Sequence, residues 1–175
     1  MSDESVEPPE GIEEEHQRPL PGWRRHASPL SILVFGAVVV LGMSGVLGHE
    51  RDWRASEGGV DLRVHAPEVI RNGEFLEMRF HVLSEAAIDE LVIGIEAPLW
   101  EDLTVNTMIP AATEESSEDG ELRFTFSALE PGSEFFWKVD LQVNPDIVLG
   151  NEGSVTIYDG EKPLVSTDLS IDVLP

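Results

Sequence analysis

The stretch FFWKVDLQV, Phe135 to Val143, shows the pattern that decides the fold. Large apolar residues alternate along it with mostly polar ones. Successive side chains of a β-strand point to opposite faces, so the alternation predicts a strand with one buried face. That face would collect Phe135, Trp137, Val139, Leu141 and Val143. The sequence Glu-Pro-Gly at 130–132 is typical of a turn leading into this strand.

Similar short runs recur through the last two thirds of the sequence and are separated by turn residues such as Asn72-Gly73. They cover residues 60–65, 75–82, 91–97, 103–110, 122–129, 154–160 and 164–175. About eight strands in roughly 115 residues, with no convincing helix, predict an all-β, antiparallel two-sheet sandwich. A small closed barrel would give nearly the same pattern and stays open as an alternative.

Two segments of this region, APEVIRNGEFLEMRFHV and LEPGSEFFWKVDLQV, resemble the immunoglobulin-like domains of bacterial and archaeal envelope proteins. In those domains an early strand leads through a glycine-containing turn into a longer one, and an L-x-P-G-x turn precedes a strand of alternating large residues. The resemblance covers residues 60–175 and lacks the Cys-Trp-Cys spacing of antibody-type domains. It implies an immunoglobulin-like β-sandwich that serves as a spacer, scaffold or binding module, because a fold alone grants no activity.

A second feature is the run of 22 uncharged residues from Ala27 to Gly48. At about 1.5 Å per residue, a helix of this length spans roughly 33 Å, which matches a hydrocarbon core of about 30 Å. A cleaved signal usually has an apolar region of only about 7 to 15 residues. A buried soluble helix would show a polar stripe. The run therefore predicts a single transmembrane helix at 28–48, with cleavage before His49 as the alternative.

The flanks of this run suggest an orientation. Arg24 and Arg25 lie closest to it, and Trp23 and Trp53 stand one on each side, as in interfacial aromatic belts. We expect a single-pass protein of the inner (cytoplasmic) membrane whose C-terminal domain is periplasmic or extracellular.

The expected organisation has four parts. Residues 1–27 contain seven acidic residues and four prolines, and such a segment predicts a disordered acidic cytoplasmic tail. The transmembrane helix follows at 28–48, then a linker at 49–59, and the immunoglobulin-like sandwich at 60–175.

Composition excludes several functions. The chain has 34 Asp and Glu against 11 Lys and Arg, a net charge of −23, which disfavours nucleic acid and anionic lipid headgroups. It has no cysteine, so disulfides, thiolate metal sites and cysteine nucleophiles are excluded. No G-x-S-x-G context surrounds any serine. The sequence therefore predicts neither an enzyme nor a cofactor.

Two sets of residues are candidates for binding a metal. The polar loop expected at 113–121 offers Glu114, Glu115, Glu118 and Asp119, and calcium prefers six to eight such oxygens. It lacks the spacing of an EF-hand, and a mobile acidic loop is the alternative. His65 and His81 fall on the polar faces of their strands and could meet if these pair, with Glu77 or Glu68 as a third ligand. Solvent-facing histidines are the simpler interpretation.

Trp100 precedes the run at 103–110, and Met108 lies near the end of that run. If exposed, they would form an anchor for a protein partner; if buried, they would belong to the core.

Together these features predict a membrane-anchored, non-catalytic extracytoplasmic β-sandwich. It would act as a scaffold or accessory module for another envelope or membrane protein, and would contact the lipid bilayer through its N-terminal helix. The alternative is an adhesion or ligand-binding ectodomain that uses calcium or an exposed aromatic patch to grip a polymer or another cell.

Overall fold

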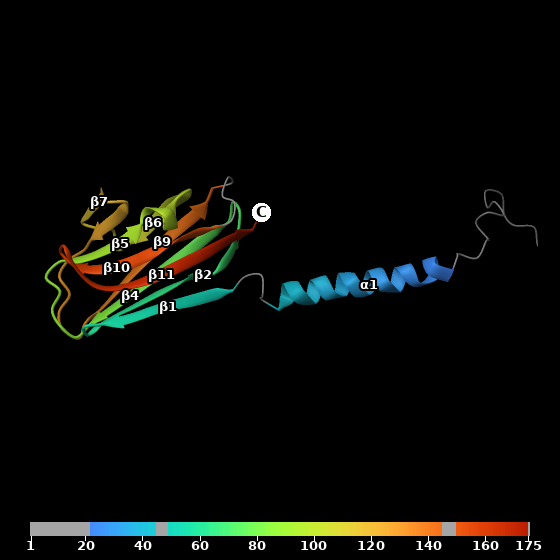
Figure 1. Cartoon of the computed structure of the whole chain (residues 1–175), viewed down its shortest axis with the longest axis horizontal. Helices are drawn as coiled ribbons and strands as arrows, with labels where there is room; N and C mark the ends of the chain where they lie inside the picture. The colour runs from blue at the N-terminus through green and yellow to red at the C-terminus, as the bar shows by residue number, and fades with distance from the viewer. Residues whose placement is uncertain (1–21, 45–48, 145–149, 175) are drawn as a thin grey trace, which may run out of the picture. The chain divides into compact units, whose positions relative to one another are not determined.

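A computed structural model describes residues 22–44, 49–144 and 150–174. The chain divides into two compact units, 1–44 and 45–175. Among the described residues, the first unit contains a long helix and the second contains the strands (Figure 1). Residues 1–21 of the predicted acidic tail lie outside the described residues.

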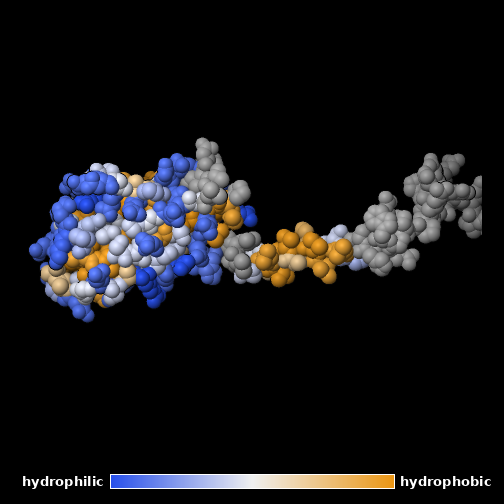
Figure 2. Space-filling view, in the orientation of Figure 1, coloured by the Kyte–Doolittle hydropathy of each residue, from blue (hydrophilic) through white to orange (hydrophobic). Residues whose placement is uncertain are grey.

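Helix α1 spans Gly22–Met43 and therefore begins six residues before the predicted transmembrane segment. Its side chains are described from Pro29 onward. They are mainly apolar, as the orange colour of α1 in Figure 2 shows. The large exposed ones are Leu30, Ile32, Leu33, Val34, Phe35, Val38, Val39, Val40, Leu41 and Met43. Among the described residues, no helix has the length and apolarity that a membrane span requires.

The first sheet of the second unit has five antiparallel strands in the order β1-β2-β4-β9-β6. Their bounds are β1 Glu50–Glu57, β2 Val60–Pro67, β4 Phe75–Ser84, β9 Glu134–Val143 and β6 Leu103–Ile109. Gly58 and Gly59, both at positive φ, close the β1–β2 hairpin with the two-residue turn that suits the twist of paired strands.

The second sheet has six strands in the order β3-β11-β10-β5-β8-β7. Their bounds are β3 Val69–Arg71, β11 Lys162–Leu174, β10 Asn151–Asp159, β5 Leu91–Glu96, β8 Glu121–Thr125 and β7 Glu114–Glu118. All neighbours are antiparallel except β3 and β11, which pair in parallel over three residues. A short helix, α2 (Ala97–Trp100), follows β5.

The core lies between the two sheets, and Trp137 is its centre. This side chain is 1% exposed, and the ring centroids of Phe80 and Phe124 lie 4.8 and 4.9 Å from its own. Phe126 and Trp100 follow at 5.4 and 6.1 Å. Burying each large apolar side chain contributes about 1.5–3 kcal/mol. Residues from both sheets meet here, so the aromatic cluster joins the two layers.

The chain is an all-β two-sheet sandwich. Alternate residues are buried along β2, β4 and β9, as the sequence predicts. The closed-barrel alternative is wrong, because the strands form two separate sheets with β1, β6, β3 and β7 at their edges.

Three sequence predictions are corrected. The linker predicted at 49–59 contains β1, which pairs with the whole of β2. The polar loop predicted at 113–121 forms β7 and its turn into β8. Trp53 was expected in a membrane interface, but it is 7% exposed and belongs to the core. The reason is the pairing of β1 with β2, which turns Trp53 toward the interior.

Candidate functional site

The outer face of the five-stranded sheet gathers charged and aromatic side chains from β1, β2, β4 and β9. Because the strands are in register, these side chains form rows across the sheet. One row contains Asp52, His65, Arg79 and Lys138. The next row contains Arg54, Arg63, His81 and Phe136. We call this surface the outer face of the five-stranded sheet throughout.

Asp52 is the centre of the ion pairs at the β1–β2 end of this face. Its carboxylate accepts hydrogen bonds from Arg63 Nη2 at 2.7 Å and from Arg54 Nη2 at 2.9 Å. His65 Nδ1 lies 2.8 Å from the same carboxylate, and His65 Nε2 lies 3.0 Å from Glu50. The hydrogen bond from Arg63, followed by those from His65 and Arg54, holds the pKa of Asp52 well below its usual range.

Glu77 has a similar place between β4 and β9. It accepts hydrogen bonds from Lys138 Nζ and Arg79 Nε. The contact with Lys138 is the main cause that lowers the pKa of Glu77, and the same contact raises the pKa of Lys138. Asp140 lies 3.4 Å from the Lys138 ammonium. Both carboxylates with lowered pKa values therefore remain ionised near neutral pH, which suits ion pairing and not proton transfer.

An aromatic pair stands next to these charges. His81 and Phe136 are cross-strand partners, and their rings stack with centroids 4.3 Å apart and an angle of 4° between their planes. Phe136 is 61% exposed although it lies within β9 and is paired with β4. His81 Nε2 lies 3.4 Å from a Glu134 carboxylate oxygen, but it has no hydrogen-bond partner among the described residues.

Two adjoining hollows lie on this face and share Arg63 and His81. The smaller, of about 210 Å³, is lined by Arg63, His65, Arg79, Phe80, His81 and Phe136. The larger, of about 440 Å³, extends toward Arg54, Ser56, Asp61 and Leu83. We call the two hollows together the arginine groove.

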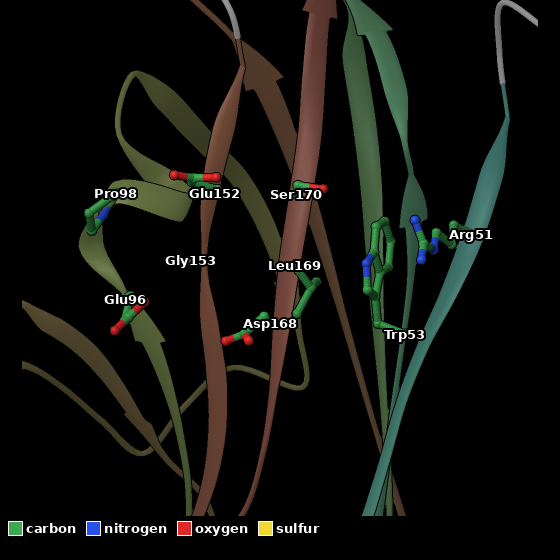
Figure 3. A pocket seen from close by; sticks show the side chains of 9 residues that line it. All are labelled: Arg51, Trp53, Glu96, Pro98, Glu152, Gly153, Asp168, Leu169 and Ser170. Carbon is green, nitrogen blue, oxygen red and sulfur yellow. The ribbon is translucent and has the colours of Figure 1, made fainter.

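A hollow of larger volume lies elsewhere and has a different character. It has a volume of about 620 Å³ and includes Arg51 and Trp53 on β1 and Asp168 and Ser170 on β11 (Figure 3). Its carboxylates stand on separate elements, Glu96 before α2, Glu152 on β10 and Asp168 on β11. Glu96 already accepts a hydrogen bond from the Ser154 backbone. This hollow therefore offers a weaker set of ligand contacts than the arginine groove.

The outer face of the six-stranded sheet has its own polar group, built over Gly94. A Cβ at Gly94 would collide with the Glu121 carboxylate, so glycine lets this side chain lie flat across β5. Glu121 accepts hydrogen bonds from Tyr158 Oη at 2.9 Å and from Arg123 Nε at 2.9 Å. Arg123 also stacks over the Tyr158 ring at 5.0 Å.

This second group is more buried than the first. The side chains of Arg123 and Glu121 are 17% and 12% exposed, whereas Arg63 is 48% and Arg79 is 64% exposed. The hydrogen bond to Glu121, with that to Glu161, raises the pKa of Arg123. Burial, followed by the hydrogen bond with Glu121, raises the pKa of Tyr158. Arg123 is thus held in place by its neighbours and has little freedom to meet a ligand.

The predicted calcium ligands do not form a loop. Glu114, Glu115 and Glu118 lie in β7, where successive side chains point to opposite faces, and Asp119 occupies the turn at φ 50°. The two histidines are not direct cross-strand partners, because His65 faces Arg79 and His81 faces Arg63, although both line the smaller hollow. No group of three or more His, Asp or Glu within the described part of the chain is placed to hold a metal ion.

The predicted partner contacts belong to the core. Trp100 is 6% exposed and packs on Phe124, with ring centroids 5.3 Å apart. Met108 is half-buried against the same core. Neither can form an exposed anchor. The side chains of Trp23, Arg24 and Arg25, predicted to flank the membrane, lie outside the described residues.

The sequence predicts the outward direction of His65 and His81 but not their neighbours. The aromatic pair combines His81 with Phe136, whose place on the polar face is visible in the alternation of β9. Asp52 could not be found in this way, because it lies in the segment taken as a linker.

No protein-family model and no curated protein matches the sequence. Among solved structures, the chain is similar to the solution structure of CaCohA2 from Clostridium acetobutylicum. The TM-score is 0.44 and the sequence identity is 12%, over 67% of this chain and 92% of that chain. A similarity of this size carries no functional argument, and the fold assignment rests on the strand pairings.

Proposed function

We propose that the chain is a membrane-anchored, non-catalytic interaction module of the immunoglobulin-like envelope type. In this proposal the anchor is the uncharged segment 28–48, which contains the apolar part of α1 and continues past its end, and the sandwich serves as a scaffold or accessory module for another envelope or membrane protein. The single observation that carries the proposal is the exposed apolar surface of α1.

Ile32, Leu33, Val34 and Phe35 are consecutive and all more than half exposed. Consecutive residues of an α-helix are about 100° apart, so these four alone place apolar side chains all around the axis. The chain also carries no charged residue from Ala27 to Gly48. A helix that is apolar on every side is stable when it is surrounded by lipid or by other apolar helices. Both surroundings are supplied by a membrane that contains a partner protein.

The direction of insertion follows from the flanking charges. Arg24 and Arg25 lie closer to the apolar run than Arg51 and Arg54 do on its other side, and cytoplasmic flanks carry an excess of arginine and lysine. We therefore place the tail in the cytoplasm and the sandwich outside the inner membrane.

The non-catalytic part of the proposal is supported by the state of the polar groups. Asp52 and Glu77 have lowered pKa values because cations surround them. A general acid or base that works near neutral pH needs its pKa moved the other way. Ion pairs of this kind serve structure and recognition.

Membrane fractionation of the full chain tests the anchor. We expect the protein to stay in the pellet after alkaline carbonate extraction. Val34→Asp combined with Val38→Asp should release it, because each charge at the centre of a membrane helix costs about 3 kcal/mol. Ser117→Asp, on the exposed edge strand β7, is the matched control and should stay in the pellet. A soluble wild-type protein, or a mature chain that begins near residue 49, would contradict the anchor.

Cross-linking in intact membranes tests the partner. Photoreactive groups placed at Phe35 and at Ser117 sample α1 and β7, respectively. A module that docks through its helix should give one stoichiometric adduct from Phe35. Lipid adducts alone at Phe35 would leave an anchor without a membrane partner and would refute the accessory role.

A further inference from the structure

The arginine groove has the features of a ligand site on the outer face of the five-stranded sheet. It is lined by three guanidinium groups, Arg54, Arg63 and Arg79, and by His65, His81 and Phe136. Among its described lining residues, Asp61 is the one that carries a carboxylate. The carboxylates that neutralise the arginines approach them from outside the hollows.

The arginines keep hydrogen-bonding capacity for a ligand. A guanidinium has five N–H donors, and it binds carboxylates with two parallel bonds. The described hydrogen bonds use Nη2 of Arg63, toward Asp52, and Nε of Arg79, toward Glu77. A carboxylate could therefore bind the other nitrogens without breaking either ion pair. Those ion pairs would hold both guanidinium groups in position.

The charge of this face differs from that of the rest of the chain. Outward positions of β1, β2, β4 and β9 carry four Arg and Lys with six Asp and Glu. The other residues from His49 onward carry four Arg and Lys with 21 Asp and Glu. At physiological ionic strength the screening length is about 8 Å, so an anion in the groove responds mainly to its neighbours.

Phe136 adds an apolar wall. One face of its ring is covered by the parallel His81 ring, and the side chain is still 61% exposed. The stacking fixes the ring, so little conformational entropy is lost when a ligand packs against it. Ligand sites commonly combine such an aromatic surface with a few polar groups that set orientation.

The position of the groove on the sheet indicates which class of polymer, a peptide, a nucleic acid or a polysaccharide, could bind there. Extended peptides gain affinity by adding a strand to a free sheet edge. Most of the groove lies over β2, β4 and β9, which are interior strands paired on both sides, and it reaches the edge strand β1 through the residues Arg54, Ala55 and Ser56. Nucleic acid carries about one charge per 1.7 Å of duplex, and the acidic residues around the groove would repel so dense a run of charge, whereas a single carboxylate in the groove responds mainly to its neighbours. A sugar needs no free edge, because side chains alone can bind its hydroxyl and carboxylate groups.

We propose that the arginine groove binds a hexuronic acid residue of an acidic polysaccharide. Arg63 and Arg79 bind the carboxylate, and Phe136 packs against the pyranose ring. This site is independent of the membrane anchor and would operate whether or not the anchor proposal holds.

Calorimetric titration of the full chain, kept in mild detergent, tests the site. The probe is tetragalacturonic acid, and its fully methyl-esterified form is the matched ligand with the same sugar skeleton and no charge. We expect binding of the acid form and at least tenfold weaker binding of the ester. Tetraglutamic acid serves as the acidic peptide probe and should bind at least tenfold more weakly than the sugar.

Matched variants locate the site. Arg63→Gln and Arg79→Gln should each weaken binding of the acid about tenfold or more, and Phe136→Ala should weaken binding of both sugar forms. Lys162→Gln removes a cation from the other sheet and should leave the affinity unchanged. Circular dichroism of each variant checks its fold, and Arg63→Lys replaces Arg63→Gln if the latter is unfolded.

Four outcomes would overturn the proposal. They are the absence of binding to the acid form, equal binding of acid and ester, equal or tighter binding of tetraglutamic acid, and an equal loss in Lys162→Gln and the groove variants.

Discussion

The two outer faces of the sandwich both contain arginine–carboxylate pairs, but these pairs are mostly buried on one face and largely exposed on the other. On the six-stranded sheet, Arg123 and Glu121 are mostly covered and lie flat over Gly94. On the five-stranded sheet, Arg63 and Arg79 stand beside a stacked aromatic pair and remain about half exposed or more. The difference teaches that an arginine–carboxylate pair has no fixed role. Local space decides whether it stabilises the sheet or presents donors to a ligand.

The core beneath both faces should show the largest effect. Trp137→Ala removes the ring that contacts aromatic partners of both sheets, and we expect a loss of about 3–5 kcal/mol in the free energy of unfolding. Trp137→Phe is the control. It keeps an aromatic ring and removes an indole N–H that has no described hydrogen-bond partner, so its cost should be much smaller. Urea denaturation followed by far-UV circular dichroism measures both, and similar losses would contradict this account.

Gly94→Ala, in the six-stranded sheet, should cause the second largest loss in the free energy of unfolding. The new Cβ would displace the Glu121 carboxylate and break its bonds with Tyr158 and Arg123, at a cost of about 1–3 kcal/mol. The test is a double-mutant cycle with Glu121→Ala. Most of the cost of Gly94→Ala should vanish in the Glu121→Ala background. If the full cost persists there, the glycine is required for a reason other than room for Glu121.

Arg79→Ala should have a smaller effect, because this arginine is 64% exposed. Exposed ion pairs typically contribute about 0–1 kcal/mol, so we expect a loss below about 1 kcal/mol. Arg123→Ala, the equivalent change on the other sheet, should cost more, since it leaves Glu121 partly buried without its main cation. Equal losses in thermal melting would remove the distinction between the two faces.

The smallest expected effect is a pH-dependent difference in stability between the wild type and Asp52→Asn. The pKa of Asp52 is lowered in the folded chain, so its contribution to stability is present above the ordinary value of about 4 and is lost as the pH falls below it. We expect Asp52→Asn to be less stable than the wild type at pH 6, with the gap narrowing between pH 4 and pH 2. Urea midpoints measured at each pH follow this gap. A gap that widens in acid would show that Asp52 does not rely on its cationic neighbours.

Strong alternation made the centre of the fold predictable. Strands such as β4 and β9 bury every second residue, and their pattern is visible without any structure. The edges were not predictable in this way. β7 has the sequence EESSE with every residue exposed, and it becomes a strand through its pairing with β8. β1 has Trp53 as its single buried residue, so its sequence resembles a polar linker.

The side chains on the outer face of the five-stranded sheet could be predicted in part, for a related reason. The outward direction of His65, His81, Arg79 and Phe136 follows from strand period alone. Their neighbours across the sheet depend on register, which is fixed by pairing partners far away in sequence. The burial of Trp100 was also not predictable from the sequence. The sequence left open whether this side chain is exposed or buried, and α2 directs it into the aromatic core.

The position of β11 within the six-stranded sheet determines when the domain can fold. This strand lies between β10 and β3 and supplies Val165, Leu169, Ile171 and Val173 to the core. The six-stranded sheet cannot be completed until these residues have left the ribosome or the export channel. Folding of the sandwich must therefore wait until β11 has emerged, and a chain that stopped before β11 would leave the flank of β10 uncovered.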